Sequence, residues 1–391
     1  MALRLPIRLV RSTAPPVALS FPRPTPVPAV TGSTIWPCQT RQSSHSPMGV
    51  AIDRKKVTIK SLRALYKKKE PITMLTAHDF PSGHVAEAAG MDMVLVGDSL
   101  AMVALGMDDT SEVCLDEMIL HCRSVSRAVG AAFTVGDLPM GSYEISPAQG
   151  VASAIRLIKE GRVQSVKLEG GAEMATTIKA ITQAGIPVVA HVGLTPQRQN
   201  ALGGFRVQGK STAGAVRILN DALAVQEAGA FMVVLEAVPS EIARIITDKL
   251  KIPTIGIGAG TGCSGQVLVQ VDMTGNFPRG RYLPKFVKKY GDVWGESLRA
   301  IEKYRDEVKS GEYPSLEYTY PISKEDVEEF EKQNTESVSL QSSFLRRNLT
   351  TVSNFWEALI LKTRFLRIGA DGRGWKRTVT NIKKYSATVS F

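Results

Sequence analysis

The sequence predicts an α/β protein, a (β/α)8 TIM barrel, and two observations carry this prediction. Seven short runs rich in apolar and β-branched residues recur along the chain, separated by stretches with helical spacing. These runs are almost continuously apolar rather than alternating, which is typical of parallel strands covered by helices. The length of 391 residues accommodates such a barrel, which takes roughly 200–250 residues, with room for extensions.

The predicted strands and helices alternate along the middle of the chain. Strands are expected at residues 72–78, 93–99, 132–138, 165–170, 187–193, 231–238 and 254–260. Helices are expected at residues 112–129, 147–161, 172–185 and 213–229. A proline opens the second of these helices and a glycine ends each of the last three, as is typical of helix termini. An eighth, less distinct unit around residues 266–290 would complete the barrel.

An open, doubly wound sheet is the alternative architecture. The glycines at positions 256, 258, 260 and 262 superficially resemble a dinucleotide-binding loop. That fingerprint normally opens the first βα unit and has an acidic residue about 20 positions later, whereas these glycines follow the seventh strand. In barrels the loops after strands seven and eight often approach an anion, so the glycines favour the barrel.

The basic charge of the chain is concentrated at its two ends. The formal charge is +11, yet residues 1–48 hold five Arg and no acid, and residues 335–391 hold ten Lys or Arg against three acids. Residues 49–334 therefore carry about −1. A near-neutral middle argues against a nucleic-acid-binding protein, which needs a basic stripe on its folded part.

Composition and charge together predict three segments. Residues 1–48, rich in Ser, Thr, Pro and Arg, have the composition of a disordered mitochondrial presequence, so we expect a mitochondrial protein. Residues 49–334 form the catalytic barrel. Residues 335–391 are a basic extension of unassigned role, either a divergent tail or an amphipathic helix around 354–368 that touches a membrane or a partner. No run approaches about 18 apolar residues, so no membrane span is expected.

Ionisable residues stand at the ends of five of the seven predicted strands. In a barrel the carboxyl ends of the strands converge on one mouth, where active sites lie. Any one of these residues is explained as well by capping of the next helix. Four acids together with a Lys and a His favour a catalytic mouth. The residues are Asp98 with the adjacent Ser99, Asp137, Lys167, Glu169, His191 and Glu236.

Carboxylates at separate strand ends indicate a Mg²⁺ site. Four Cys without paired spacing exclude a disulfide framework and a Cys-built zinc site. Oxygen ligands suit Mg²⁺, which keeps positions open for water or substrate. A Mg²⁺ held by Asp98 and Asp137 would bind a 2-oxo acid and stabilise its enolate, with Lys167 on the substrate carboxylate. A Schiff base at Lys167 is the alternative, although it has little need for three metal-type acids.

Seven motifs occur in the order found in one known family. They are VGDSL (96–100), GDLP (136–139), VKLEGG (166–171), HVGLTPQ (191–197), GGFRVQG (203–209), LEAVP (235–239) and IGIGAG (255–260). From about Val57 to Pro314 the chain thereby closely resembles the ketopantoate hydroxymethyltransferase family. The resemblance implies a (β/α)8 barrel, a Mg²⁺ ion and a homo-oligomer, namely a decamer.

The resemblance also implies a reaction and a role for each matching residue. A hydroxymethyl group would pass from 5,10-methylenetetrahydrofolate to 3-methyl-2-oxobutanoate, giving 2-dehydropantoate on the route to pantothenate and coenzyme A. By position, the metal ligands would be Asp98, Asp137 and Glu169, the last directly or through water. Residues contacting the oxo acid would be Asp98, Ser99, Asp137 and Lys167. The general base would be Glu236, and His191 would supply a hydrogen bond in the site.

Two positions depart from the family pattern. Met107 stands where members often have His, and His78 stands where they often have Tyr, a position at which packing or capping is the simpler interpretation. Neither change touches the metal or base positions. The competing function is a Mg²⁺-dependent lyase or phosphonomutase-like barrel that acts on a 2-oxo acid without folate. Such an enzyme would not need the motifs at 191–197 and 203–209.

Overall fold

The computed structural model describes residues 54–365, and it describes side chains for residues 54–344. The predicted presequence and the end of the basic extension lie outside the described residues. The described chain forms two compact units that divide between Val267 and Leu268.

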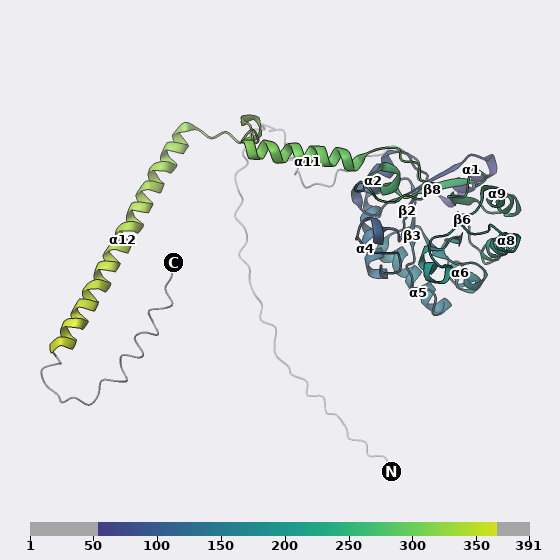
Figure 1. Ribbon diagram of the computed structural model, residues 1–391, viewed down its shortest axis with the longest axis horizontal. Helices are drawn as coiled ribbons and strands as arrows, with labels where there is room; N and C mark the ends of the chain where they lie inside the picture. The colour runs from purple at the N-terminus through teal and green to yellow at the C-terminus, as the bar shows by residue number, and fades with distance from the viewer. Residues whose placement is uncertain (1–53, 366–391) are drawn as a thin grey trace, which may run out of the picture. The chain divides into compact units, whose positions relative to one another are not determined.

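A closed barrel of eight parallel strands forms the first unit (Figure 1). Each strand pairs with its neighbour in chain order, and the ring closes between β8 and β1. The strands are β1 Ile72–Thr76, β2 Met93–Val96, β3 Phe133–Asp137, β4 Ser165–Glu169, β5 Val188–Gly193, β6 Met232–Glu236, β7 Thr254–Ile257 and β8 Gly265–Leu268. The predicted (β/α)8 fold is confirmed, and the doubly wound alternative is wrong because the sheet closes.

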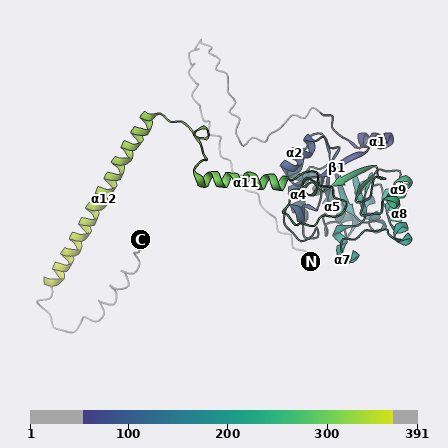
Figure 2. The ribbon, with the colours of Figure 1, turned by 45° about the horizontal axis from the view of Figure 1, so that its top comes forward.

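The helices of this unit lie around the strands, most of them on the outside of the barrel, and Figure 2 shows the same layer from a turned view. They are α1 Ile59–Lys68, α2 Phe80–Ala88, α3 Leu100–Val103, α4 Leu115–Ala128, α5 Pro147–Arg156, α6 Ala175–Gln183, α7 Gln199–Leu202, α8 Thr212–Glu227 and α9 Ser240–Lys249. Short π and 3-10 turns stand at Leu157–Gly161, Ala172–Met174 and Pro196–Arg198. Helix α5 begins at Pro147, as predicted, because the Ser146 hydroxyl accepts a bond from the Gln149 amide at 3.2 Å.

The barrel interior is apolar along most of each strand and polar at the carboxyl end. Successive side chains of a strand point to opposite faces, so residues two apart share a face. Phe133 and Val135 of β3 lie in the hydrophobic core, as do Met232 and Val234 of β6. The next residues in these two series are Asp137 and Glu236. The same alternation that fills the core therefore delivers ionisable groups to the mouth.

The second unit is mainly helical. It contains α10 Gln270–Thr274, α11 Val293–Ser310, a 3-10 turn at Leu316–Tyr318 and α12 Lys324–Phe365. The indistinct eighth unit of the sequence corresponds to the short β8 and the five-residue α10. Helix α12 runs through the predicted boundary between residues 334 and 335 and includes positions 354–365. Within residues 54–365 no helix combines the length and the apolar character that crossing a membrane requires.

Candidate active site

Strand pairing places the predicted site residues next to one another at the barrel mouth. Asp137 lies opposite Lys167 across β3 and β4, and Glu169 lies opposite His191 across β4 and β5. Glu236 ends β6 beside β5. Asp98 and Ser99 follow β2 after Gly97, and Ser99 precedes α3 without capping it through its side chain. The structure thus brings together the residues that the sequence selects separately.

A buried ion pair joins β3 and β4. Lys167 Nζ lies 2.9 Å from Asp137 Oδ2, and the backbone amide of Asp98 donates to the same oxygen at 3.1 Å. Burial lowers the pKa of Lys167, but the charges of Asp137, Asp98 and Glu169 outweigh it and hold this pKa above its usual range. Lys167 is therefore a cation although it is only 4% exposed.

The Asp137 carboxylate has one oxygen in use and one without a partner. Burial raises the pKa of Asp137 to about 7; the charge of Lys167 opposes this shift and that of Asp98 adds to it. Among the described residues, Asp137 Oδ1 is a buried oxygen with no hydrogen-bond donor. A buried carboxylate oxygen left unpaired is costly, so this atom is suited to receive a cation or a donor from a bound ligand.

His191 lies between two acidic residues. Its Nε2 lies 3.2 Å from Glu236 Oε2, and its Nδ1 lies 3.5 Å from both Glu169 Oε1 and Lys167 Nζ. Burial, and then the charge of Lys167, lower the pKa of His191, whereas Glu236 raises it less. His191 is therefore neutral near pH 7. Lys167 donates to Nδ1, so the neutral ring carries its proton on Nε2. Among the described residues Nε2 makes no well-aligned hydrogen bond, although Glu236 Oε2 lies near it.

Glu169 and Glu236 differ in burial. Glu169 is 1% exposed, and its pKa is raised well above the usual range by burial and then by the charge of Asp98. The Glu236 side chain is 15% exposed. A group that removes a proton from a bound substrate must be reachable by that substrate, so Glu236 suits this role better than Glu169.

The backbone beside Glu236 is held in an unusual conformation. Ala237 has a φ of 48°, in the left-handed region that a residue with a Cβ seldom adopts. Two backbone bonds hold it there, from its own N–H to Ile257 O and from Gln208 N–H to its carbonyl, both at 2.9 Å. Such conformations persist where the surroundings impose them, and they concentrate at functional sites.

Two polar residues of the mouth were not assigned from the sequence, Gln197 and Tyr143. Gln197 ends the motif at 191–197, but no role attached to it there. Its Nε2 donates to Asp98 Oδ2 at 2.8 Å and to Leu138 O at 3.0 Å, and its backbone N–H donates to Glu169 Oε2 at 3.0 Å. Tyr143 donates its hydroxyl proton to Gln197 Oε1 at 2.6 Å. Tyr143 lies in the loop between β3 and α5, outside the strand pattern that indicated the other site residues.

His78 lies just after β1, and it contacts Asp79 and His121. Its side chain faces Asp79, with 3.8 Å between His78 Nε2 and Asp79 Oδ2, and Asp79 caps α2 through the Ser82 amide. Its carbonyl is contacted by the ring of His121. Burial lowers the pKa of His78. These contacts favour the packing interpretation of this residue.

The mouth fits a metal that needs few protein ligands. Within the described part of the chain, no three Cys, His, Asp or Glu side chains form a ready-made metal cluster. Structural zinc and calcium sites require more protein ligands than this. Mg²⁺ usually takes only one or two carboxylates and fills its other positions with water or substrate oxygens. Asp98 and Asp137, with its unpartnered oxygen, match that requirement.

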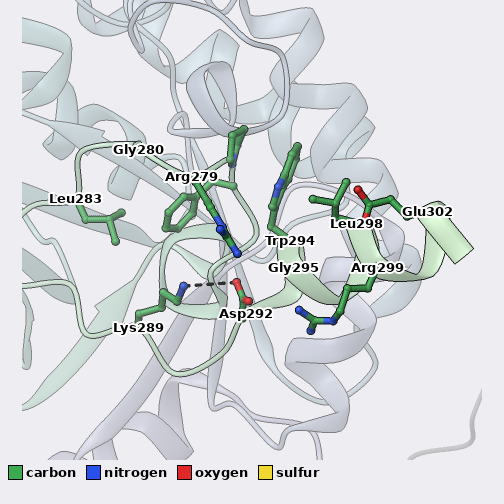
Figure 3. A pocket seen from close by; sticks show the side chains of 12 residues that line it. Arg279, Gly280, Leu283, Lys289, Asp292, Trp294, Gly295, Leu298, Arg299 and Glu302 are labelled. Carbon is green, nitrogen blue, oxygen red and sulfur yellow. Dashed lines mark ion pairs between the residues drawn. The ribbon is translucent and has the colours of Figure 1, made fainter.

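A separate cavity of about 880 Å³ lies in the second unit (Figure 3). Its lining includes Arg279, Lys289, Trp294 and Leu298, and Lys289 Nζ lies 3.5 Å from Asp292 Oδ1. None of the predicted site residues lines it. The cavity is therefore distinct from the barrel mouth.

The fold and the mouth define the class of protein: a (β/α)8 barrel enzyme with a buried, carboxylate-rich site. The family model of ketopantoate hydroxymethyltransferase matches residues 56–316. The chain belongs to this family and is a hydroxymethyltransferase, so the competing lyase class does not apply.

Relatives from a fungus, a plant and a bacterium carry the same name, 3-methyl-2-oxobutanoate hydroxymethyltransferase. The protein from Emericella nidulans is 73% identical over 298 residues, covering 76% of this chain and 85% of the relative. A rice protein named as the mitochondrial form 2 is 51% identical, and the match covers 71% of this chain and 70% of the rice protein. The protein from Moorella thermoacetica is 53% identical, and the match covers 68% of this chain and 98% of that protein. The likeness thus spans most of each relative.

Proposed function

We propose that this protein transfers a hydroxymethyl group from 5,10-methylenetetrahydrofolate to 3-methyl-2-oxobutanoate, giving 2-dehydropantoate for pantothenate synthesis. The names of its relatives support the reaction. The observation that carries the proposal is the arrangement in one mouth of a Lys167–Asp137 ion pair and a neutral His191 against Glu236. The Lys167 ammonium would bind an anionic substrate, and Glu236 would act as the base.

Mg²⁺ is the cofactor that this mouth would hold. Asp98 and Asp137 would be its ligands, and Glu169 a third ligand directly or through water. When bound, the ion supplies Lewis acidity that lowers the cost of negative charge on the ketone oxygen of the oxo acid. Lys167 and Ser99, beside the metal carboxylates, would bind the substrate carboxylate. A charge-assisted bond from a buried ammonium orients such a group strongly.

Glu236 would remove the proton from C3 of the oxo acid. This proton is weakly acidic because C3 neighbours a ketone. His191 Nε2 lies 3.2 Å from Glu236 Oε2, and the neutral His191 ring places no positive charge beside the Glu236 carboxylate. The resulting enolate carbon would then bond to the methylene carbon of the folate. Over the whole reaction both C–N bonds to that carbon break and water provides the hydroxyl oxygen. The two folate nitrogens take up the C3 proton and one proton of the water, which releases tetrahydrofolate.

Assembly and location complete the proposal. We expect a homo-oligomer, a decamer as in the family, in the mitochondrion. The mitochondrial name of the rice relative supports the location. Small-molecule substrates are the expected partners.

Exchange of the C3 proton tests the role of Glu236. Removing a well-placed base typically costs about 10²–10⁴ in rate. We expect Glu236→Gln to slow exchange of the C3 proton of 3-methyl-2-oxobutanoate into D₂O by this factor, followed by proton NMR with Mg²⁺ present. Binding of the oxo acid, measured by calorimetry, should persist. Glu241→Gln, an exposed position at the start of α9, is the matched control. Exchange at the wild-type rate in Glu236→Gln would refute the assignment.

A further inference from the structure

Gln197 connects the ends of four strands through one side chain and its own amide. It is 4% exposed and lies in the turn after β5. Its three bonds as donor reach Asp98 after β2, Leu138 after β3 and Glu169 at the end of β4. Two of these partners are the proposed metal carboxylates Asp98 and Glu169.

Tyr143, Asp98 and Leu138 together set which way the Gln197 amide points. A glutamine amide can turn over and exchange its oxygen for its nitrogen, so its orientation follows from its partners. The Tyr143 hydroxyl lies 2.6 Å from Gln197 Oε1 and 3.2 Å from the carbonyl oxygen of Glu169, and it accepts from the Glu169 backbone N–H at 3.3 Å. It donates to Gln197 Oε1, which leaves Nε2 for Asp98 Oδ2 and Leu138 O.

The Gln197 contacts bear directly on the two carboxylates. Each bond engages one oxygen of a carboxylate, Oδ2 of Asp98 and Oε2 of Glu169. Each carboxylate is thereby held in one rotamer, and its second oxygen points in a fixed direction. If the amide turned over, its oxygen would lie against Asp98 Oδ2, and two acceptors would repel each other. Partners that orient metal-binding carboxylates in this way typically change metal affinity 10–100-fold when they are removed.

We propose that Gln197 is a positioning residue that sets the metal affinity of Asp98 and Glu169, and that Tyr143 acts through Gln197 by helping to fix its amide. The inference rests on the proposed Mg²⁺ site. A purely structural role for the two residues would lower the thermal stability of the chain without changing metal affinity at a temperature where the protein is folded.

Binding of Mn²⁺ to the full chain, without substrate, tests this inference. Mn²⁺ takes the same oxygen ligands as Mg²⁺, and its free form is counted by electron paramagnetic resonance. We expect Gln197→Leu and Tyr143→Phe each to raise the Mn²⁺ dissociation constant by about 10-fold or more. The double variant should be little weaker than Gln197→Leu, because the shortest bond of the Tyr143 hydroxyl is with Gln197 and its longer contacts reach only the backbone of Glu169. Tyr66→Phe, which loses a bond to Leu250 O away from the mouth, is the matched control and should bind as the wild type does.

Each other outcome has a distinct meaning. Wild-type affinity in both single variants would overturn the inference, and multiplying effects in the double variant would overturn the role of Tyr143. Tyr143→Phe removes one oxygen only. If Gln197→Leu does not fold, the Mn²⁺ affinity of Tyr143→Phe alone tests the inference. Failure of the wild-type chain to bind Mn²⁺ would overturn the metal site itself, and with it this inference.

Discussion

Burial decides how the acidic residues of the mouth behave. Asp137 and Glu169 lie almost completely out of water, and burial is the largest cause of the raised pKa of each. Lys167 compensates in part for the charge of Asp137 and also lowers the pKa of His191. A second cation beside Asp137 would complete this compensation. The charges of the mouth therefore suit the Mg²⁺ ion that we propose.

Metal affinity should rise with pH through the range in which Asp137 loses its proton. The pKa of Asp137 is raised to about 7, so below this value a proton competes with Mg²⁺ for the carboxylate. We expect the apparent Mg²⁺ dissociation constant to fall by up to about tenfold per pH unit below pH 7 and to level off above it. Calorimetric titration at several pH values measures this. Asp137→Asn should bind more weakly with a shallower pH dependence, and a constant affinity in the wild type would contradict the assignment.

The sequence predicted that the ionisable residues near the strand ends lie together at one mouth, and it did not indicate the loop residue Tyr143 that lies with them. Asp98, Asp137, Glu169 and Glu236 follow apolar runs, so their positions in the chain alone place them at one mouth. Tyr143 lies between β3 and α5, and its contact with Gln197 joins positions 54 residues apart. No local pattern encodes such a contact, because it depends on how two loops fold over the barrel end.

At the scale of elements, the close approach of β5 and β6 positions Glu236. Gly193 ends β5 with a φ of 97°, and a Cβ there would lie 2.4 Å from the Glu236 carbonyl oxygen. Glycine is required both for this backbone conformation and for this contact. The following Ala237, with its left-handed backbone, completes the turn that aims Glu236.

Gly193→Ala should therefore impair catalysis as well as stability. The added methyl group must displace the backbone of Glu236, and a misplacement of about 1 Å can cost on the order of 10² in rate. Gly185→Ala is the matched control, because Gly185 also has a positive φ, of 83°, but no atom within 4 Å of the new Cβ. We expect it to cost about 1 kcal/mol of stability with kcat unchanged. Equal kcat values in the two variants, by steady-state assay with denaturation curves alongside, would contradict this account.

The strands were predictable because they are buried on both sides. Each of the seven predicted strands is present, and most are shorter than the apolar run because the last residues turn into the mouth loops. The eighth unit was indistinct for a physical reason. β8 has only four residues with partly exposed positions, and α10 has five residues, too few to show a helical period.

At the scale of the whole molecule, the barrel is separate from the source of the basic charge. The family match ends at residue 316, and α12 begins at Lys324. The near-neutral residues 49–334 contain all of the proposed site. The charge of +11 therefore belongs to the ends of the chain and tells nothing about the substrate.

The N-terminal segment should direct a protein fused to it into mitochondria. Residues 1–48 have five Arg and no acidic residue, as import sequences do. We expect these residues fused to a fluorescent protein to give a mitochondrial signal by microscopy, and the same fusion with the five Arg replaced by Gln to remain in the cytosol. A diffuse signal from the unaltered fusion would refute the presequence.

The transfer reaction itself tests the central claim most directly. The full chain would be incubated with 3-methyl-2-oxobutanoate and 5,10-methylenetetrahydrofolate labelled with ¹³C in its methylene carbon, and the products followed by NMR. The account predicts labelled 2-dehydropantoate when Mg²⁺ and both substrates are present, and none when the folate is omitted or the metal is removed by chelation. Cleavage of the oxo acid without folate, or no labelled product with all components present, would contradict it.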